Sequence, residues 1–318
     1  MDRITRLTEY TAEANEIKEK IKQVAKEKGV TIENNIDTPL TVLDKISTQP
    51  TGEYNIETML NEDGTQILNI THKDYKPYET TFSANTPSQI SKVSALISEN
   101  NMNSQQVYET YGWSIGDSIS IPLTNGEEIE MQIIGINHDD KSDGTGKAGL
   151  TLQMVNCLAT LYPMNSTSTN AGGYPASPMK TTTLPTIKLL LPQEWQDVIK
   201  LVDKKSANGG SSNFSQVVTL SEDIFLLSQY EVWASAGYAQ SAALEGSQYE
   251  FWQMNTGSTP KIKQYDKNGD GVVDTKVSWW FRSCVSTMTN SYIFTNTSGS
   301  SSRGASSNSN GISFAFCV

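Results

Sequence analysis

The sequence predicts an α+β protein with few helices and with sheets built from local hairpins. Short alternating apolar segments are separated by turn-forming pairs such as Asp63-Gly64 and Asn125-Gly126, which is typical of β-hairpins. Apolar residues at helical spacing occur in only a few segments, among them 3–29 and 88–99. With 318 residues, the chain is long enough for two domains.

The first segment, residues 3–29, is predicted to be a helix, because apolar residues recur at helical spacing between lysines and glutamates. Gly29 is the predicted stop signal for this helix. Two interpretations of it stay open: it seeds a trimer or docks on a partner, or it packs on its own domain. A second short helix is predicted at 39–47, where Leu40, Leu43 and Ile46 share a face.

A hairpin is predicted next, from the alternating segments 54–56 and 66–70 on either side of the turn 61–64. Residues 1–80 therefore form a predicted helix-plus-hairpin module for attachment or oligomerisation. The Thr-, Ser- and Asn-containing stretch 81–86 is the predicted linker to a larger domain at 87–318.

The larger domain begins with an amphipathic helix at 88–99, whose Ile90, Val93 and Ile97 lie on one side. Further elements are expected in chain order: a hairpin of 119–123 with 128–136, a strand at 150–155, a helix at 195–202, short strands at 224–227 and 231–233, and a hairpin of 260–265 with 277–282. Most of the tryptophans are expected to be buried.

The C-terminal stretch 278–318 has two apolar ends around a polar middle. The ends are 279–281 and 312–316, the middle consists largely of Ser, Thr, Asn and Gly, and the whole stretch contains no side-chain carboxylate. Such a composition is typical of a flexible tail or of a set of binding loops. The alternating apolar segment 312–318 favours an ordered surface anchored by strands.

Composition limits the classes of partner. A net charge of −11 with only 19% charged residues argues against a nucleic-acid-binding protein. No apolar run approaches the roughly 18 residues of a membrane-spanning helix, so we expect no membrane insertion. The first residues contain no apolar core of a signal peptide, which predicts synthesis in the cytoplasm without a signal.

Catalytic chemistry finds little support in the sequence, and we expect no enzyme. The chain contains two histidines, His72 and His138, and no Gly-x-Ser-x-Gly motif. The three cysteines, Cys157, Cys284 and Cys317, are expected to be buried free thiols, with a Cys284–Cys317 bridge as the alternative. Asp139 and Asp140 follow His138 and are expected to cap backbone amides of a polar loop; metal binding there is the alternative.

One loop has the spacing of a calcium site. Oxygen-bearing side chains stand at positions 1, 3, 5 and 9 of the loop, with Gly271 at position 6, whereas Val277 replaces the glutamate of position 12. The alternative is a hairpin turn that uses Asp, Asn and Gly for their turn conformations. Calcium is thus a candidate cofactor, no other cofactor is expected, and the candidate ligands are Asp266, Asn268, Asp270 and Asp274.

Several motifs in a fixed order resemble a known domain. They are the segments 135–140, 146–149, 164–165, 169–174, 177–179, 191–192, 225–228, 231–232 and 245–249, followed by Trp279-Trp280-Phe281-Arg282-Ser283 and the Phe-rich end. Together they resemble the DUF6273-type domains of phage and prophage tail proteins of Gram-positive and gut bacteria, over roughly residues 85–318. Cys284 stands where the family often has proline.

The closing order of a Trp-Trp strand, a polar segment and an aromatic strand also resembles C-type-lectin-like variable proteins, including targets of diversity-generating retroelements. This resemblance implies a C-type-lectin-like domain that presents a variable C-terminal surface to a receptor on another cell. The segment 1–80 is similar to attachment segments of phage tail fibres. The implied location is the virion tail.

The resemblance implies a receptor-binding or tail-fibre protein, a homo-oligomer and favoured trimer, that contacts a host cell-surface glycan or protein and other tail subunits. The ligand-binding residues expected on its surface are Ser286, Met288, Asn290, Tyr292, Phe294, Asn296, Arg303, Ser306, Asn308 and Asn310. Tyr292 and Phe294 are expected to be anchors. Two alternatives remain, a structural tail or baseplate component without receptor binding and an enzyme of the formylglycine-generating type.

Overall fold

The computed structural model describes residues 78–207, 217–235, 237–238 and 243–318, together with three strands nearer the N-terminus. The chain divides into two compact units, Met1–Pro77 and Tyr78–Val318. The helices predicted at 3–29 and 39–47 lie outside the described residues.

The first unit contains a three-stranded sheet in the order β1-β2-β3. Its strands are β1 (Thr31–Ile32), β2 (Glu53–Leu60) and β3 (Gln66–His72). β2 and β3 are antiparallel, and Leu60 pairs with Gln66 across the connection that contains Asp63-Gly64. This is the local pairing expected from alternating segments separated by an Asp-Gly pair.

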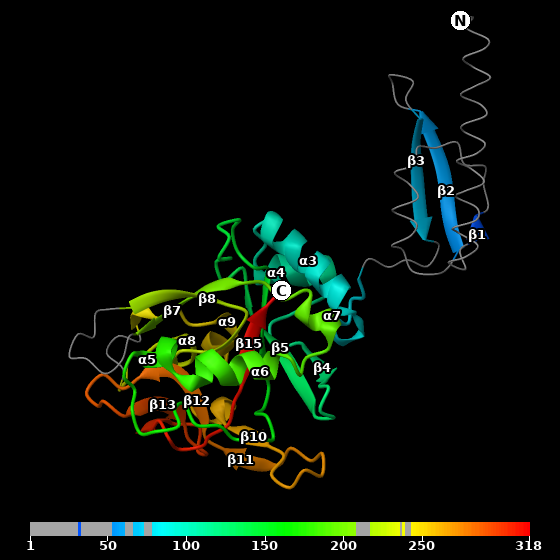
Figure 1. Ribbon diagram of the computed structural model, residues 1–318. Helices are drawn as coiled ribbons and strands as arrows, with labels where there is room; N and C mark the ends of the chain where they lie inside the picture. The colour runs from blue at the N-terminus through cyan, green and yellow to red at the C-terminus, as the bar shows by residue number, and fades with distance from the viewer. Residues whose placement is uncertain are drawn as a thin grey trace, which may run out of the picture. The chain divides into compact units, whose positions relative to one another are not determined.

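The second unit mixes short helices with small antiparallel sheets, which is an α+β architecture (Figure 1). Its helical segments are η1 (Phe82–Ala84), α3 (Pro87–Glu99), α4 (Ser104–Tyr111), α5 (Gly173–Ala176), η2 (Met179–Thr183), α6 (Leu184–Lys188), α7 (Gln193–Gln196), α8 (Gln229–Trp233), α9 (Glu250–Met254) and η4 (Thr259–Lys261). Its strands are β4 (Ser118–Pro122), β5 (Glu128–Ile136), β6 (Leu150–Met154), β7 (Val202–Ala207), β8 (Val217–Glu222), β9 (Ile224–Leu226), β10 (Lys263–Tyr265), β11 (Thr275–Val277), β12 (Trp279–Cys284), β13 (Ser291–Thr295), β14 (Ser301–Ala305) and β15 (Phe314–Cys317).

The central sheet of this unit has the strand order β4-β5-β6-β15-β9, and its neighbouring strands are antiparallel. β4 and β5 form the predicted hairpin around Asn125-Gly126, where Gly126 has the positive φ of 91° that such a turn requires. β15 comes from the far end of the chain and lies between β6 and β9, in the middle of the unit (Figure 1).

β15 is buried on both faces. Phe314 and Phe316 point into one core cluster, whereas Ala315 and Cys317 belong to the other. All four side chains have no exposed surface. Since successive side chains of a strand point to opposite faces, this strand lies between the two cores and helps to hold both together.

Three predicted elements differ in the structure. Of the hairpin expected from 260–265 with 277–282, only β10 pairs with β11 (Thr275–Val277), and β12 (Trp279–Cys284) pairs with β13 instead. The helix expected at 195–202 ends at Gln196, and Val202 already begins β7, which pairs with β8. The segment 231–233, expected as a strand, belongs to the helix α8, because Ser228 and Glu231 form a capping box at its start.

The segment 81–86, predicted as a linker, lies inside the second compact unit. It contains η1, whose Phe82 is buried. Thr86 then caps α3 through a capping box with Gln89. No helix in the described part of the chain is long and apolar enough to cross a membrane.

Candidate functional site

A three-stranded antiparallel sheet, β12-β13-β14, carries the polar C-terminal segment. β12 is buried along its whole length, whereas β14 is the edge strand and is half-exposed. Figure 1 places β12 and β13 at the end of the unit away from α3. We call the exposed and half-exposed side chains of 165–171, 286–290 and 296–310 the polar surface.

The structure divides the ten predicted ligand-binding residues into three groups. Met288, Arg303 and Asn308 are exposed, and the exposed fraction of Met288 is 39%. Half-buried positions are Ser286, Asn290, Phe294, Asn296 and Asn310. Tyr292 and Ser306 are fully buried.

The expectation that Tyr292 is a surface anchor is therefore corrected, because its ring has no exposed surface and belongs to the core. Phe294, the other expected anchor, packs edge-on against Trp280, with ring centroids 5.5 Å apart. A side chain at Gly304 would come within 2.9 Å of Phe294, so the edge strand lies directly against this ring. Both aromatic residues hold the sheet to the core.

Ser306 is buried because it joins two polar loops. Its hydroxyl accepts a hydrogen bond from the Thr169 amide at 2.8 Å and donates to the Thr167 carbonyl at 3.1 Å. Asn170 of the same loop donates from Nδ2 to the carbonyls of Met288, at 2.7 Å, and of Ser291, at 3.0 Å. The loop 165–171 is thus fixed to the C-terminal segment and contributes to the same surface.

Two parts of this surface were missed by the sequence reasoning. The loop 165–171 has the same Ser, Thr and Asn composition as 285–310, and that shared composition is the signal that was available. Tyr238 is 43% exposed, and its ring lies under the Arg303 guanidinium at 4.6 Å, a cation–π contact. The Tyr238 carbonyl also accepts a hydrogen bond from the Ser286 amide at 3.3 Å.

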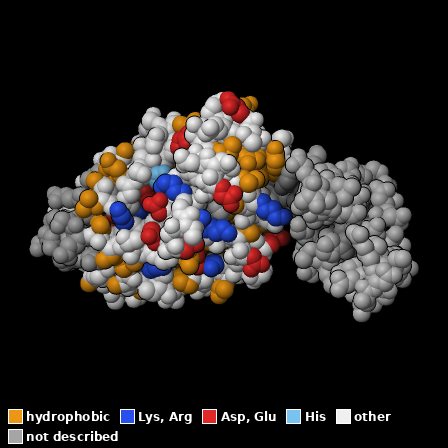
Figure 2. Space-filling model, turned by 90° about the horizontal axis from the view of Figure 1, so that it is seen from above, with side chains coloured by type: hydrophobic (Ala, Val, Ile, Leu, Met, Phe, Trp, Pro, Cys, Tyr) orange, Lys and Arg blue, Asp and Glu red, His pale blue; other side chains and the backbone are white. Residues whose placement is uncertain are grey.

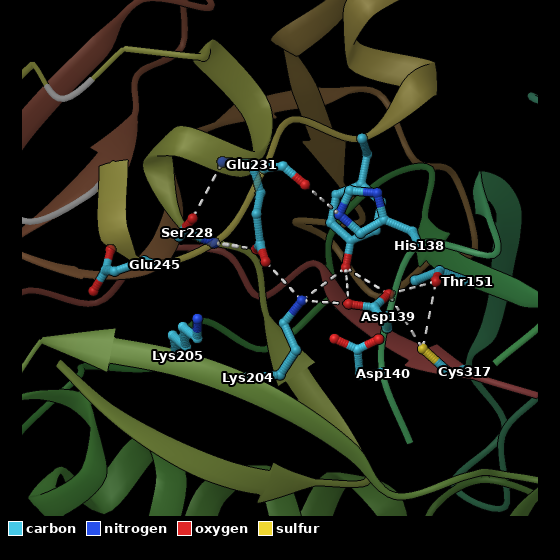
Figure 3. Close-up of polar contacts among 12 residues, drawn as sticks. His138, Asp139, Asp140, Thr151, Lys204, Lys205, Ser228, Glu231, Glu245 and Cys317 are labelled. Carbon is cyan, nitrogen blue, oxygen red and sulfur yellow. Dashed lines mark hydrogen bonds and ion pairs between the residues drawn. The ribbon is translucent and has the colours of Figure 1, made fainter. Parts of the chain in front are cut away.

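β12 connects this sheet to a buried ion network. Arg282 donates from Nη1 and Nη2 to the two carboxylate oxygens of Glu231, at 2.6 and 2.9 Å. Lys204 Nζ lies 2.6 Å from Glu231 Oε1 and 2.7 Å from Asp139 Oδ1 (Figure 3). Arg282 Nη2 also donates to the Glu245 carbonyl at 2.6 Å. Five segments that are far apart in the chain meet in this network.

The charged forms of Lys204, Arg282, Asp139 and Glu231 are stabilised, whereas burial raises the pKa of the Glu245 carboxyl. Burial alone would raise the pKa of Asp139 and of Glu231, but Lys204 lowers the pKa of Asp139, and Arg282 and Lys204 lower that of Glu231. Burial would lower the pKa of Lys204 and of Arg282, yet their carboxylate neighbours raise both above the usual range. Two cations therefore balance two anions in a region without solvent, which is the condition under which buried charges are tolerated.

Asp139 has a different role from the one predicted. Its carboxylate accepts hydrogen bonds from Lys204, from Thr151 at 2.6 Å and from the Tyr249 hydroxyl at 2.9 Å, all inside the protein. Asp140, by contrast, is exposed and pairs with Lys147 at 3.0 Å. The alternation Val202, Lys204, Ser206 on β7 places Lys204 inward, and this was the available signal for its burial.

One Ser–His contact resembles a nucleophile–base pair. Ser247 Oγ and His138 Nε2 are 3.4 Å apart, and the His138 ring stacks on Tyr249 at 3.9 Å. Burial lowers the pKa of His138. The neighbouring Asp139 carboxylate, however, is occupied by Lys204, Thr151 and Tyr249, so in the described residues it does not orient the imidazole as a catalytic triad requires.

The predicted calcium loop, between β10 and β11, has the contacts of a turn. Asp266 Oδ1 accepts hydrogen bonds from the amides of Asn268 and Gly269, and Oδ2 accepts one from Gly271. Asp270 accepts from a backbone amide two residues on, and Asp274 accepts from the adjacent Thr275 hydroxyl. The described residues contain no group of three or more His, Cys, Asp or Glu placed to hold a metal ion. This geometry favours the turn interpretation over calcium.

The cysteines are buried free thiols. Burial raises the pKa of Cys157 and of Cys284 to about 12 each. The Cys317 thiol, which contacts Thr151 and Asp139, has its pKa raised by burial as well. These thiols are therefore packing groups and not nucleophiles.

The chain was compared with protein-family models. The model of a domain of unknown function, DUF6273, matches residues 156–318. The chain belongs to the DUF6273 family. No curated protein and no solved structure matches the chain. The DUF6273 match begins after β6 and includes Lys204, Glu231 and Arg282, whereas Asp139 precedes it.

Proposed function

We propose that this DUF6273 protein is a non-enzymatic receptor-binding protein of a phage or prophage tail, and that its polar surface attaches to a glycan or protein on the host cell. The observation that carries the proposal is the construction of the polar surface. Its exposed side chains are mainly Ser, Thr and Asn, while the backbones beneath them are tied to a buried sheet. Hydroxyl and amide groups on a rigid frame make adaptable hydrogen bonds at little entropic cost.

The second support is the low charge of this surface. Within 285–310, Arg303 is the single charged side chain, and no carboxylate is present to repel an acidic or carbonyl group of a ligand. Arg303 is exposed and stacked on Tyr238, and this Arg–Tyr pair has the residue types that dominate binding energy at interfaces.

The finer fold and the assembly belong to the same proposal. A C-type-lectin-like arrangement accounts for the order of a buried Trp-Trp strand, polar loops and a terminal aromatic strand, and diversification by a retroelement would act on 285–310. The first unit would attach the protein to the tail or join three copies. Several copies on one particle would gain avidity, so that weak single contacts suffice.

The test is adsorption of the labelled full chain to a panel of bacterial cells, followed by two variants on the cells that bind it. Arg303→Ala and Met288→Ala remove two exposed side chains, and we expect each to reduce binding about tenfold. The matched controls are Lys276→Ala and Met254→Ala, which remove exposed side chains of the same kinds outside the polar surface. All four should keep their stability within about 0.5 kcal/mol.

Unchanged adsorption of both polar-surface variants would contradict receptor binding through this surface. It would favour the alternative, a structural tail or baseplate component. An equal loss of adsorption in the control variants would also contradict receptor binding through this surface, because it would show that the contact with the cell is not located at 285–310.

A further inference from the structure

The strand β14 lies at the edge of the sheet β12-β13-β14, and its sequence does not protect that edge. The strand Ser301–Ala305 contains no proline and no lysine, and its pairing with β13 is regular, without a bulge. Proteins usually protect an edge strand by one of these devices, because its backbone can pair with another chain. Apart from Arg303 the side chains of β14 are small, so they offer little hindrance to a second strand.

The hydrogen bonds to β13 show which backbone groups of β14 point outward. The Asn296 amide donates to the Ser300 carbonyl at 2.9 Å, and the Ser306 amide donates to the Asn290 carbonyl at 2.8 Å. Residues of an antiparallel pair alternate between bonded and non-bonded positions. The even-numbered residues of β14 therefore bond to β13, whereas the backbone groups of the odd-numbered residues point away from it.

The outward groups belong to Ser301, Arg303 and Ala305. The Ala305 carbonyl accepts a hydrogen bond from the Asn308 amide at 3.0 Å. The other outward groups are the three N–H groups and the carbonyls of Ser301 and Arg303, and none of them has a hydrogen-bond partner within the described ranges of the chain. A row of alternating donors and acceptors is what an added strand requires.

Both ends of β14 are fixed to other parts of the unit. In the turn before it, Gly299 has a positive φ of 78° and lies so close to the Ser258 carbonyl oxygen that a side chain there would collide with it. After the strand, the Ser306 hydroxyl bonds to the loop 165–171, through Thr167 and Thr169. The edge is thus preformed, and a partner would not have to order it.

The charge at the edge limits the choice of partner. Arg303 is exposed at the centre of β14, and the stretch 285–310 contains no carboxylate. This is a local feature, since lysines, arginines and carboxylates are intermixed on the face shown in Figure 2. A second copy paired antiparallel about Arg303 would place two like charges opposite each other, which is unfavourable, whereas Asp or Glu at that position is favourable.

We propose that β14 binds an extended protein segment carrying an acidic residue, which adds to the sheet β12-β13-β14 as a fourth strand. Main-chain hydrogen bonds supply the affinity, and Arg303 selects the acidic side chain. This inference rests on the proposed function, because β14 belongs to the polar surface, and it names the partner of that surface as a polypeptide and not a glycan.

The test is fluorescence anisotropy of the full chain with three labelled ten-residue peptides. The first alternates Thr and Val around one central Glu, the second has Lys in place of Glu, and the third is the first with N-methyl groups on two neighbouring central amides. Neighbouring amides point to opposite edges of a strand, so the third peptide is blocked on both. We expect saturable binding of the first peptide, about tenfold weaker binding of the second, and none of the third.

Variants connect the binding to the edge of β14. Ala305→Pro removes one outward N–H group and should weaken binding of the Glu peptide about tenfold. Proline is tolerated on an edge strand where the N–H group faces solvent, and urea unfolding checks that the variant is folded. Ala305→Ser keeps the N–H group and should bind as the wild type does. Arg303→Ala should remove the preference for Glu over Lys.

Three results would overturn the proposal. The first is no binding of the Glu peptide up to millimolar concentration, the second is equal binding of the N-methylated peptide, and the third is equal weakening by Ala305→Pro and Ala305→Ser. Each of them can occur while cells still adsorb the protein.

Cell adsorption separates this proposal from the proposed function. If Arg303→Ala lowers adsorption and Ala305→Pro does not, receptor binding by the polar surface stands, strand addition is refuted and a glycan is indicated. If the Glu peptide binds as expected but no cell adsorbs the protein, strand addition stands and attachment to a host cell is contradicted.

Discussion

Replacing Glu231 with glutamine should remove much of the stability of the second unit. Glu231 contacts Arg282 through both carboxylate oxygens, contacts Lys204, and accepts from the Ser228 amide at 2.8 Å. Glutamine keeps the shape but has one acceptor oxygen and no charge. Lys204 and Arg282 would then lose the carboxylate that they share, and breaking a buried pair in this way costs about 3–5 kcal/mol. That is a large part of the roughly 5–15 kcal/mol that stabilises a typical domain.

The assay is urea unfolding followed by tryptophan fluorescence. All six tryptophans lie after residue 77, so the signal reports the second unit and not the first. Glu194→Gln, an exposed glutamate on α7, is the control and should change the unfolding free energy by less than about 0.5 kcal/mol. Lys204→Met added to Glu231→Gln restores the balance of charge and should recover part of the loss. A loss below about 1 kcal/mol for Glu231→Gln alone would refute the role assigned to the network.

Three further expectations follow from burial. Tyr292→Ala should cost about 3–5 kcal/mol in the same assay, whereas Asn308→Ala should cost less than about 0.5 kcal/mol; equal costs would place the Tyr292 ring outside the core. Because burial raises the pKa of Cys157 to about 12, a thiol reagent at mildly alkaline pH should label the chain only after denaturation, and rapid native labelling would contradict this. The pKa of Asp139 in the folded protein lies below its unfolded value of about 3.9, so ionised Asp139 stabilises the fold above that pH. This stabilisation is lost as the pH falls toward the folded pKa. A urea midpoint that stays constant below about pH 4 would contradict this expectation.

Local features of the fold were predictable from the sequence. The hairpin of β4 and β5 follows from alternating segments around Asn125-Gly126, and α3 follows from its apolar spacing. In both cases the partners lie within a few residues of one another, so the pattern and the contact are in the same stretch of sequence. The mixed class of the second unit followed from these local patterns.

Contacts between distant segments were not predictable in the same way. The alternating end of the chain indicated a strand, but its position between β6 and β9 depends on pairings of Ala315 with Gln153 and with Phe225. The aromatic residue Tyr292 stands among polar residues and therefore resembled a surface anchor, whereas strand pairing turns its ring into the core. Lys204 was missed because its counter-charges come from other parts of the chain.

The position of β15 has a consequence for the order of folding. Its pairings join residues that are far apart in the chain, and such contacts form slowly because a long loop must close first. Until they form, the edges of β6 and β9 are unpaired and the two cores lack their shared strand. The segments 286–290 and 296–310 of the polar surface lie between β12 and β15 in the chain, so both of their ends become fixed only when β15 has paired. A copy that presents an ordered polar surface has therefore already passed its slowest pairing step.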